Sequence, residues 1–472
     1  MRNKINSFKL WLLTLAITIF LLWLSLFAFN LTWLVKPEQS LVKNSVKLKK
    51  YLNKTILDGL FYDNRFIEKN FLLINTAQDF NIGKLEEPDS INQILPIVDR
   101  QKLSKLFNWL EGNKDRYRFA VCDVRFINKG IDSLGDKALQ KSINRLLQDE
   151  TPKIIFAGQF EQNKVAESIF NELNDASVLG NTNYVEKNDL DFLDYSLVSE
   201  GVSSKSLPLL LYEKSYKTKS SDGRLLKIEG LDGPMGLIKL NDTIGNTIRM
   251  WNNFVPEMLF SNDDISSLLS YESSPDKNYS EIAFMRLGRA VDSDCINLDD
   301  FCLHEKDRII FIGAFGDWHN DKHDTIYGQT DGSVILLNIY QSILNTRSYF
   351  TPFFLVILFV VFFLISMDIV FSDVFKSFLF KLLYCVFFFW VPIMILGGLS
   401  ILSPVFKKPA EAFENWIKEE RHYFILIVTA VIANFWFNKV INIFVLIFVV
   451  YLLHRIFNYF LKDNQEKTNT IV

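Results

Sequence analysis

The stretch DRQKLSKLFNWLEGNKDRYRFAVCDVRF, residues 99–126, decides the fold, because it predicts a helix that leads into a strand. Leu103, Leu106 and Leu110 recur at spacings of three and four residues, which places them in one apolar stripe along a helix. The run that closes the stretch, FAVCDVRF (residues 119–126), predicts a buried strand. A helix next to such a strand is a building unit of α/β domains.

The neighbouring residues repeat this alternation. FLLIN (residues 71–75) is typical of a short buried strand, and a loop rich in Glu, Pro, Asp and Asn connects it to Asp99, a suitable N-cap. Residues 136–148 repeat the helical pattern, and KIIFAGQ (residues 153–159) predicts a third strand. The order βαβαβ predicts an α/β domain with a mixed or mostly parallel sheet and helices on both faces.

The remainder of this central region is less regular. Between residues 161 and 278 the sequence predicts one short helix, near 206–216, and several loops. RIIFIGAF (residues 308–315) predicts a further strand. Residues 332–345 predict a helix that leads almost directly into an apolar run, so that a movement of the domain would act on a membrane segment.

An apolar segment near the start of the chain predicts a membrane anchor. All 26 residues from Leu10 to Val35 are uncharged, more than the roughly 20 that cross a bilayer. Arg2, Lys4 and Lys9 precede them and favour a cytoplasmic start. Because aromatic residues continue the run where a cleavage site would lie, we expect residues 1–35 to form an uncleaved anchor. It would place residues 36–347 outside the cytoplasm.

Further apolar runs follow this domain, at residues 348–367, 382–406 and 422–453. We expect residues 348–460 to contain three or four transmembrane segments. The third run is long for one crossing and short for two, and the second run could cross the bilayer or dip in and return. Counting basic residues favours a cytoplasmic tail, residues 461–472, which is too short for a folded output domain. The chain is thus predicted to be a multi-pass protein of the inner (cytoplasmic) membrane, with the lipid bilayer as a partner.

Composition and motifs exclude several functions. The chain carries 51 Lys and Arg against 54 Asp and Glu, a formal net charge of −3, and no basic stripe, which argues against a nucleic-acid partner. The glycine-rich, nucleophile and metalloprotease signatures of common enzymes are absent from the sequence. We therefore expect neither enzyme activity nor a cofactor.

The sequence RIIFIGAFGDWHNDKHDTIYGQTDGSVILLNIYQSIL (residues 308–344) resembles the closing motif of type-2 CHASE domains, the second class of cyclase- and histidine-kinase-associated sensory extracellular domains. It combines an apolar strand that ends in Ile-Gly (Gly313), a D-x-H-x-T step and, within the following helix, an N-x-x-x-S-x-L motif that begins at Asn338. Upstream, Arg100 fits the family's arginine-led first helix, and Asp123 fits the strand that usually ends in an aspartate. Asn75 departs from the Asp and Ser that family members often carry after the first strand.

The resemblance implies a bacterial sensor outside the cytoplasm that passes its signal through membrane helices to a separate signalling protein. A non-sensing envelope scaffold or assembly subunit is the alternative, with other envelope proteins as partners. Either interpretation is compatible with a homo-oligomer.

The loop after residue 315 is the leading candidate ligand site, since open α/β sheets bind ligands at the carboxyl ends of their strands. Asp317, His319, Asp321 and His323 alternate at period two and could together bind a divalent transition metal. Alternatively, Asp321, His323 and Thr325 hydrogen-bond to brace the loop. The full set of candidate ligand-binding residues is Arg100, Asp123, Gly313, Asp317, His319, Asp321, His323, Thr325 and Asn338.

Two cysteines predict a disulfide. Cys295 and Cys302 lie seven positions apart in the region expected outside the cytoplasm, where a disulfide would pin a small loop. Cys122, within an apolar strand, is better interpreted as a small hydrophobic residue.

Overall fold

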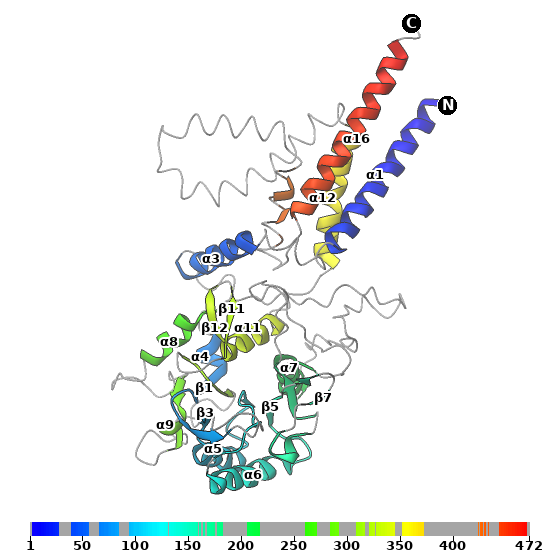
Figure 1. Cartoon of the computed structure of the whole chain (residues 1–472). Helices are drawn as coiled ribbons and strands as arrows, with labels where there is room; N and C mark the ends of the chain where they lie inside the picture. The colour runs from blue at the N-terminus through cyan, green and yellow to red at the C-terminus, as the bar shows by residue number, and fades with distance from the viewer. Residues whose placement is uncertain are drawn as a thin grey trace, which may run out of the picture. The chain divides into compact units, whose positions relative to one another are not determined.

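The computed structural model in Figure 1 describes only part of the chain. The described residues are 2–27, 39–55, 66–84, 94–130, 132–158, 160–161, 164–165, 168–174, 177–182, 205–217, 260–270, 284–291, 308–316, 321–325, 327–344, 352–371, 423, 425–427, 429–430, 433 and 443–469. They form two compact units: residues 46–349, and residues 1–45 together with 350–472.

The first unit is built on a six-stranded sheet of order β8-β5-β4-β10-β1-β9. Every pairing within this sheet is parallel. The strands are β1 (Phe71–Asn75), β4 (Phe119–Cys122), β5 (Ile154–Gly158), β8 (Leu179–Asn181), β9 (Phe284–Arg286) and β10 (Ile309–Gly313). The predicted α/β class with a mostly parallel sheet is confirmed.

The central strands are buried on both faces, as expected for parallel strands covered by helices. β1 has the predicted bounds, whereas β4, β5 and β10 are shorter than their sequence patterns predict. β4 ends at Cys122 rather than at residue 126: the Asp123 N–H still donates to the Ile312 carbonyl of β10, but residues 124–126 are not part of the strand. β10 likewise covers 309–313 rather than 308–315.

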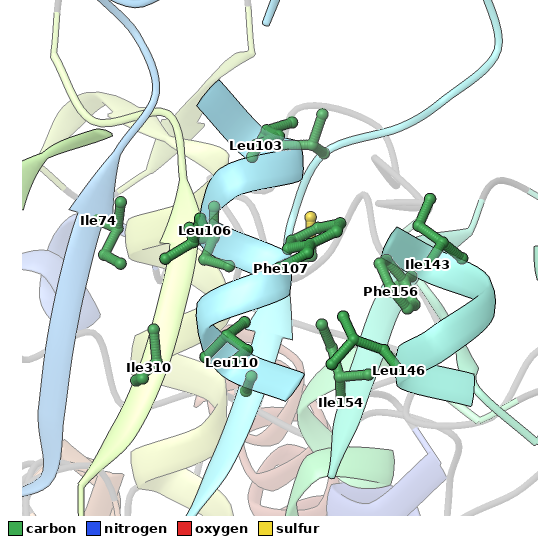
Figure 2. Close-up of a cluster of buried hydrophobic side chains, with 14 of the residues drawn as sticks. Ile74, Leu103, Leu106, Phe107, Leu110, Ile143, Leu146, Ile154, Phe156 and Ile310 are labelled. Atoms are coloured by element: carbon green, nitrogen blue, oxygen red, sulfur yellow. The ribbon is translucent and has the colours of Figure 1, made fainter. Parts of the chain in front are cut away.

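One face of the sheet is covered by α5 (Arg100–Gly112), α6 (Ser133–Leu147) and α9 (Leu287–Val291). Asp99 is the N-cap of α5, and its carboxylate accepts the backbone N–H groups of Gln101 and Lys102. α6 begins three residues earlier than predicted because Asp132 caps it. Figure 2 shows the core between helices and sheet, with Leu103, Leu106, Phe107 and Leu110 of α5 and Ile143 and Leu146 of α6 near Ile74, Ile154, Phe156 and Ile310.

The opposite face is covered by α7 (Leu207–Lys217) and α11 (Gly332–Leu344), which pack on each other. Successive side chains of a strand point to opposite faces. Thus Ile74 enters the core of Figure 2, whereas Phe71 meets Tyr340 of α11 edge to face, with ring centroids 5.6 Å apart. Both helices agree with the sequence prediction to within one residue. A short helix, α4 (Phe66–Asn70), directly precedes β1.

Small antiparallel hairpins surround the sheet. β2 (Phe80–Lys84) pairs with β3 (Ile94–Val98), within a segment predicted as a loop. β11 (Lys322–Thr325) pairs with β12 (Gly328–Asp331) immediately before α11, and β6 (Phe160–Glu161) pairs with β7 (Lys164–Val165). The unit also contains a 3₁₀ turn (Asn171–Asn174) and α8 (Asn262–Ser270). Helix α3 (Gln39–Thr55) belongs to it from Val46 onward.

The second unit is helical and consists of α1 (Arg2–Phe27), α12 (Pro352–Val370) and α16 (Ile443–Asn469), with further helical residues between 423 and 433. Trp11, near the start of α1, stacks on Phe363 and contacts Phe371, at the far end of α12, so the two helices are antiparallel. α16 continues through residues 461–469, which were predicted as a polar tail.

Within the described residues, one helix is long and apolar enough to cross a membrane, Phe8–Ser25 of α1. The predicted run 382–406 lies outside those residues. The number of crossings therefore stays a prediction.

Candidate functional site

The loops that leave β1 and β10 are joined by Asn75, the last residue of β1 and the register partner of Gly313. The Asn75 Oδ1 accepts the backbone N–H groups of Ala77 (2.9 Å) and Phe315 (3.0 Å), and its Nδ2 donates to the Phe315 carbonyl (2.8 Å). Because Asn75 is 3% exposed, these bonds satisfy a buried amide and fix the start of the candidate loop.

Asp123, just after β4, lies against the first turn of α11. Ser333 Oγ donates to the Asp123 carboxylate at 2.7 Å. A Cβ at Gly313 would collide with the Ser333 hydroxyl, so a glycine here allows α11 to begin this close to the sheet. Two predicted site residues, Asp123 and Gly313, are thus brought together by a serine that the sequence analysis did not select.

Arg100, the first residue of α5, is 4% exposed and lies beside the loop that leads to α6. Its Nη2 donates to the Asn128 carbonyl (3.2 Å), its Nε is 3.5 Å from a carboxylate oxygen of Asp136, and its guanidinium lies 4.7 Å from the centroid of the Phe126 ring. Burial lowers the Arg100 pKa, and Asp136 acts against this shift. Nε and Nη1 make no hydrogen bond to the residues that the structure describes.

The hairpin β11–β12 holds the remaining predicted residues. Asp321 and His323 lie on the same side, as their period-two spacing predicts, with His323 Nε2 3.0 Å from Asp321 Oδ1. A Cβ at Gly332 would collide with the Asp321 carboxylate, which therefore sits directly against the start of α11. Thr325, 2% exposed, donates to the Gly328 carbonyl (3.1 Å) across the turn, where Gly328 adopts a φ of 87°.

These contacts agree with the bracing role that the sequence left open for Asp321, His323 and Thr325. Metal binding by the predicted set stays a hypothesis, because Asp317 and His319 lie outside the described residues. Among the residues that are described, no group of three or more His, Cys, Asp and Glu side chains could hold a metal ion.

Asn338 lies in the middle of α11 and is fully buried. Its Oδ1 accepts the Phe260 N–H (2.8 Å), and its Nδ2 donates to the carbonyls of Phe260 (2.9 Å) and Val334 (2.9 Å). The amide thus accepts from and donates to the backbone of Phe260, the first residue of segment 260–264, which leads into α8. The structure gives this predicted ligand contact a positioning role for that segment.

Segment 260–264 also contacts Asp331, a residue that the sequence analysis missed. Asp331 is 2% exposed; its carboxylate accepts the Gly316 N–H (2.7 Å) and the Asn262 side-chain amide (3.1 Å). Its own N–H donates to the Asn262 Oδ1 (3.1 Å). An aspartate directly before a predicted helix is a signal that could have selected Asp331.

At its other end, segment 260–264 contacts α3. Asp264 accepts the Ser261 N–H (2.8 Å) and hydroxyl (2.6 Å), which caps α8, and it forms an ion pair with Lys50 of α3. Lys50 Nζ also lies 4.9 Å from the centroid of the Tyr327 ring. Burial would raise the Asp264 pKa, but the bonds from Lys50 and Ser261 outweigh it and hold the pKa below its ordinary value.

Of the four cysteines, the structure describes Cys122. Cys122 is fully buried and free, and burial raises its pKa to about 12, as expected for a small hydrophobic residue. Cys295 and Cys302 lie outside the described residues, so their disulfide stays a prediction.

Comparison with known proteins returned no match: no family model, curated protein or solved structure matches this chain. The resemblance to type-2 CHASE domains therefore rests on the quoted sequence motifs alone.

Proposed function

We propose that the chain is a bacterial integral membrane protein whose extracytoplasmic domain detects an environmental signal and passes it, through its transmembrane helices, to a separate output protein. The signal would act on the loop after β10, where the sequence places Asp317 and His319. Signalling requires that this loop be coupled to a segment that leads to the membrane.

A continuous series of polar contacts within the first unit supports such coupling. It begins at Gly316, at the start of the loop, and passes through Asp331 to Asn262. Along the short segment it reaches Asp264, whose carboxylate pairs with Lys50 of α3. In the sequence, α3 is the first described helix after α1, the candidate membrane span.

The energies of these contacts are suited to a switch. A hydrogen bond to a charged group contributes about 1.5–3 kcal/mol, and leaving a buried partner unsatisfied costs about 1–3 kcal/mol. Two conformations of a sensor typically differ by a few kcal/mol. A ligand that altered one or two of these polar contacts would therefore be able to reverse which of the two conformations is preferred.

The helical unit supports the proposed membrane arrangement. α1 and α12 are antiparallel, and both chain termini lie at the same end of this unit (Figure 1). If basic residues keep the start of α1 in the cytoplasm, the end of α16 lies on the same side. This agrees with the proposed cytoplasmic tail.

One observation favours the alternative, a non-sensing envelope scaffold. Several candidate ligand contacts already bond to the protein itself: Asp123 to Ser333, Thr325 to Gly328, and the amide of Asn338 to Phe260. Polar groups used in this way stabilise a fixed arrangement.

Crosslinking in the membrane of the native host, with a tagged full-length chain and mass spectrometry of what co-purifies, separates the two functions. A sensor predicts enrichment of a protein that carries a kinase, cyclase or similar cytoplasmic output domain. Enrichment of envelope structural proteins alone would contradict the sensor function and favour the scaffold.

A further inference from the structure

Helix α3 exposes two large, mainly apolar side chains and a lysine along one side. Leu48 is 51% exposed and Tyr51 is 61% exposed, and Lys47 beside them is also exposed. Residues three and four apart lie on one side of a helix, so these three side chains form a single stripe. All three belong to the first unit.

The other side of α3 is unusually polar for a buried face. Val46 is buried there together with Lys49, 3% exposed, and Asn53, which is fully buried. A helix on the surface of a water-soluble domain normally does the opposite, with apolar residues inside and charged residues outside. The exposed Leu48 and Tyr51 therefore point to a partner other than water.

The position of α3 limits what that partner is. Residues 28–38 separate it from α1, the candidate membrane span, and a chain of that length reaches at most about 40 Å. The helix sequence, QSLVKNSVKLKKYLNKT, contains no acidic residue, and Lys47 gives its exposed side a positive charge, so this side complements an anionic surface.

We propose that the α3 stripe, defined as Lys47, Leu48 and Tyr51, docks on the anionic surface of the lipid bilayer next to the anchor. Leu48 would enter the boundary between headgroups and acyl chains, Tyr51 would lie at headgroup depth, and Lys47 would meet the phosphates. The inference rests on the membrane anchoring in the proposed function. The Lys50–Asp264 pair would then connect a membrane-bound helix to segment 260–264.

Photocrosslinking of the full-length chain in lipid nanodiscs that contain phosphatidylglycerol tests this placement. A benzophenone amino acid replaces Leu48, and matched samples carry it at Phe20 of α1, which is 43% exposed, or at Leu134 of α6, which is 72% exposed. Mass spectrometry identifies the adducts. All three positions are exposed, so the substitutions leave the packed core intact.

The proposal predicts lipid adducts at positions 48 and 20 and none at 134. Replacing phosphatidylglycerol by phosphatidylcholine should lower the yield at position 48 about fivefold, the effect of one lysine near an anionic surface, and leave position 20 unchanged. Adducts at position 20 without any at 48, or adducts of 48 to a polypeptide, would overturn the α3 inference alone. The absence of lipid adducts at position 20 as well as at position 48 would overturn the membrane anchoring on which the proposed function depends.

Discussion

Replacing Asp331 by asparagine tests the middle of the series of polar contacts that runs from Gly316 to Lys50. The Asp331 carboxylate uses one oxygen for the Gly316 N–H (2.7 Å) and the other for the Asn262 amide (3.1 Å). Asparagine keeps one oxygen and replaces the other with an NH₂ group, which donates. One of the two donors would therefore lose its acceptor and face another donor.

The cost follows from burial. Asp331 is 2% exposed, so water does not replace the lost acceptor, and an unsatisfied buried donor costs about 1–3 kcal/mol. For a unit the size of residues 46–349, each kcal/mol lowers the melting temperature by slightly less than 2 °C, which gives a drop of about 2–5 °C for Asp331→Asn.

Thermal unfolding of the full-length chain in detergent, followed by intrinsic fluorescence, measures this drop. Asp324→Asn is the matched control, since Asp324 lies in the same hairpin, is exposed and accepts a hydrogen bond from Gln329 at the surface. We expect the control to change the melting temperature by less than about 1 °C. Equal melting temperatures for Asp331→Asn and the control would refute the importance of the buried carboxylate.

Three further predictions concern the core, the thiol and acid stability. Phe107→Ala removes a fully buried ring that meets Phe156 edge to face at 5.8 Å, and should cost about 3–5 kcal/mol of unfolding free energy in a denaturant titration. With the other cysteines replaced by serine, Cys122 should react with maleimide only after denaturation, because it is fully buried and its pKa is raised to about 12; labelling of the native chain within minutes would contradict this. The bond from Lys50 helps to hold the Asp264 pKa below its ordinary value, so the pair stabilises the fold above about pH 4 and this contribution is lost as the pH falls further. The melting temperature of Asp264→Asn should therefore fall less than that of the wild type between about pH 6 and about pH 3.

The sheet and its main helices were predictable from the sequence because their signals are local. β1, β4, β5 and β10 are short apolar runs, and the stripe of α5 is visible in the spacing of Leu103, Leu106 and Leu110. The hairpin β2–β3 was missed because its strands include Gly83 and Pro96 and sit in a polar segment. β9, with three residues, is too short to give a pattern.

The candidate site was predictable only in part. Asp123 and Gly313 lie at strand ends, where a βαβ pattern places a site. The series of polar contacts from Gly316 to Lys50, in contrast, depends on pairs that are distant in sequence. Lys50 and Asp264 are 214 positions apart, and Asn262 and Asp331 are 69 apart. A single sequence holds no signal for such pairings, so only the folded structure identifies segment 260–264 as the connection.

Hydrogen–deuterium exchange of the full-length chain in nanodiscs tests most directly whether α3 and the candidate loop are coupled. Lys50→Met keeps the aliphatic part of the side chain and removes the ion pair with Asp264, while Lys114→Met removes a surface pair elsewhere and serves as the control. Coupling predicts that Lys50→Met raises exchange about tenfold in peptides that cover segment 260–264 and Gly316, with no change in α6. An increase confined to α3, or the same pattern in Lys114→Met, would contradict it.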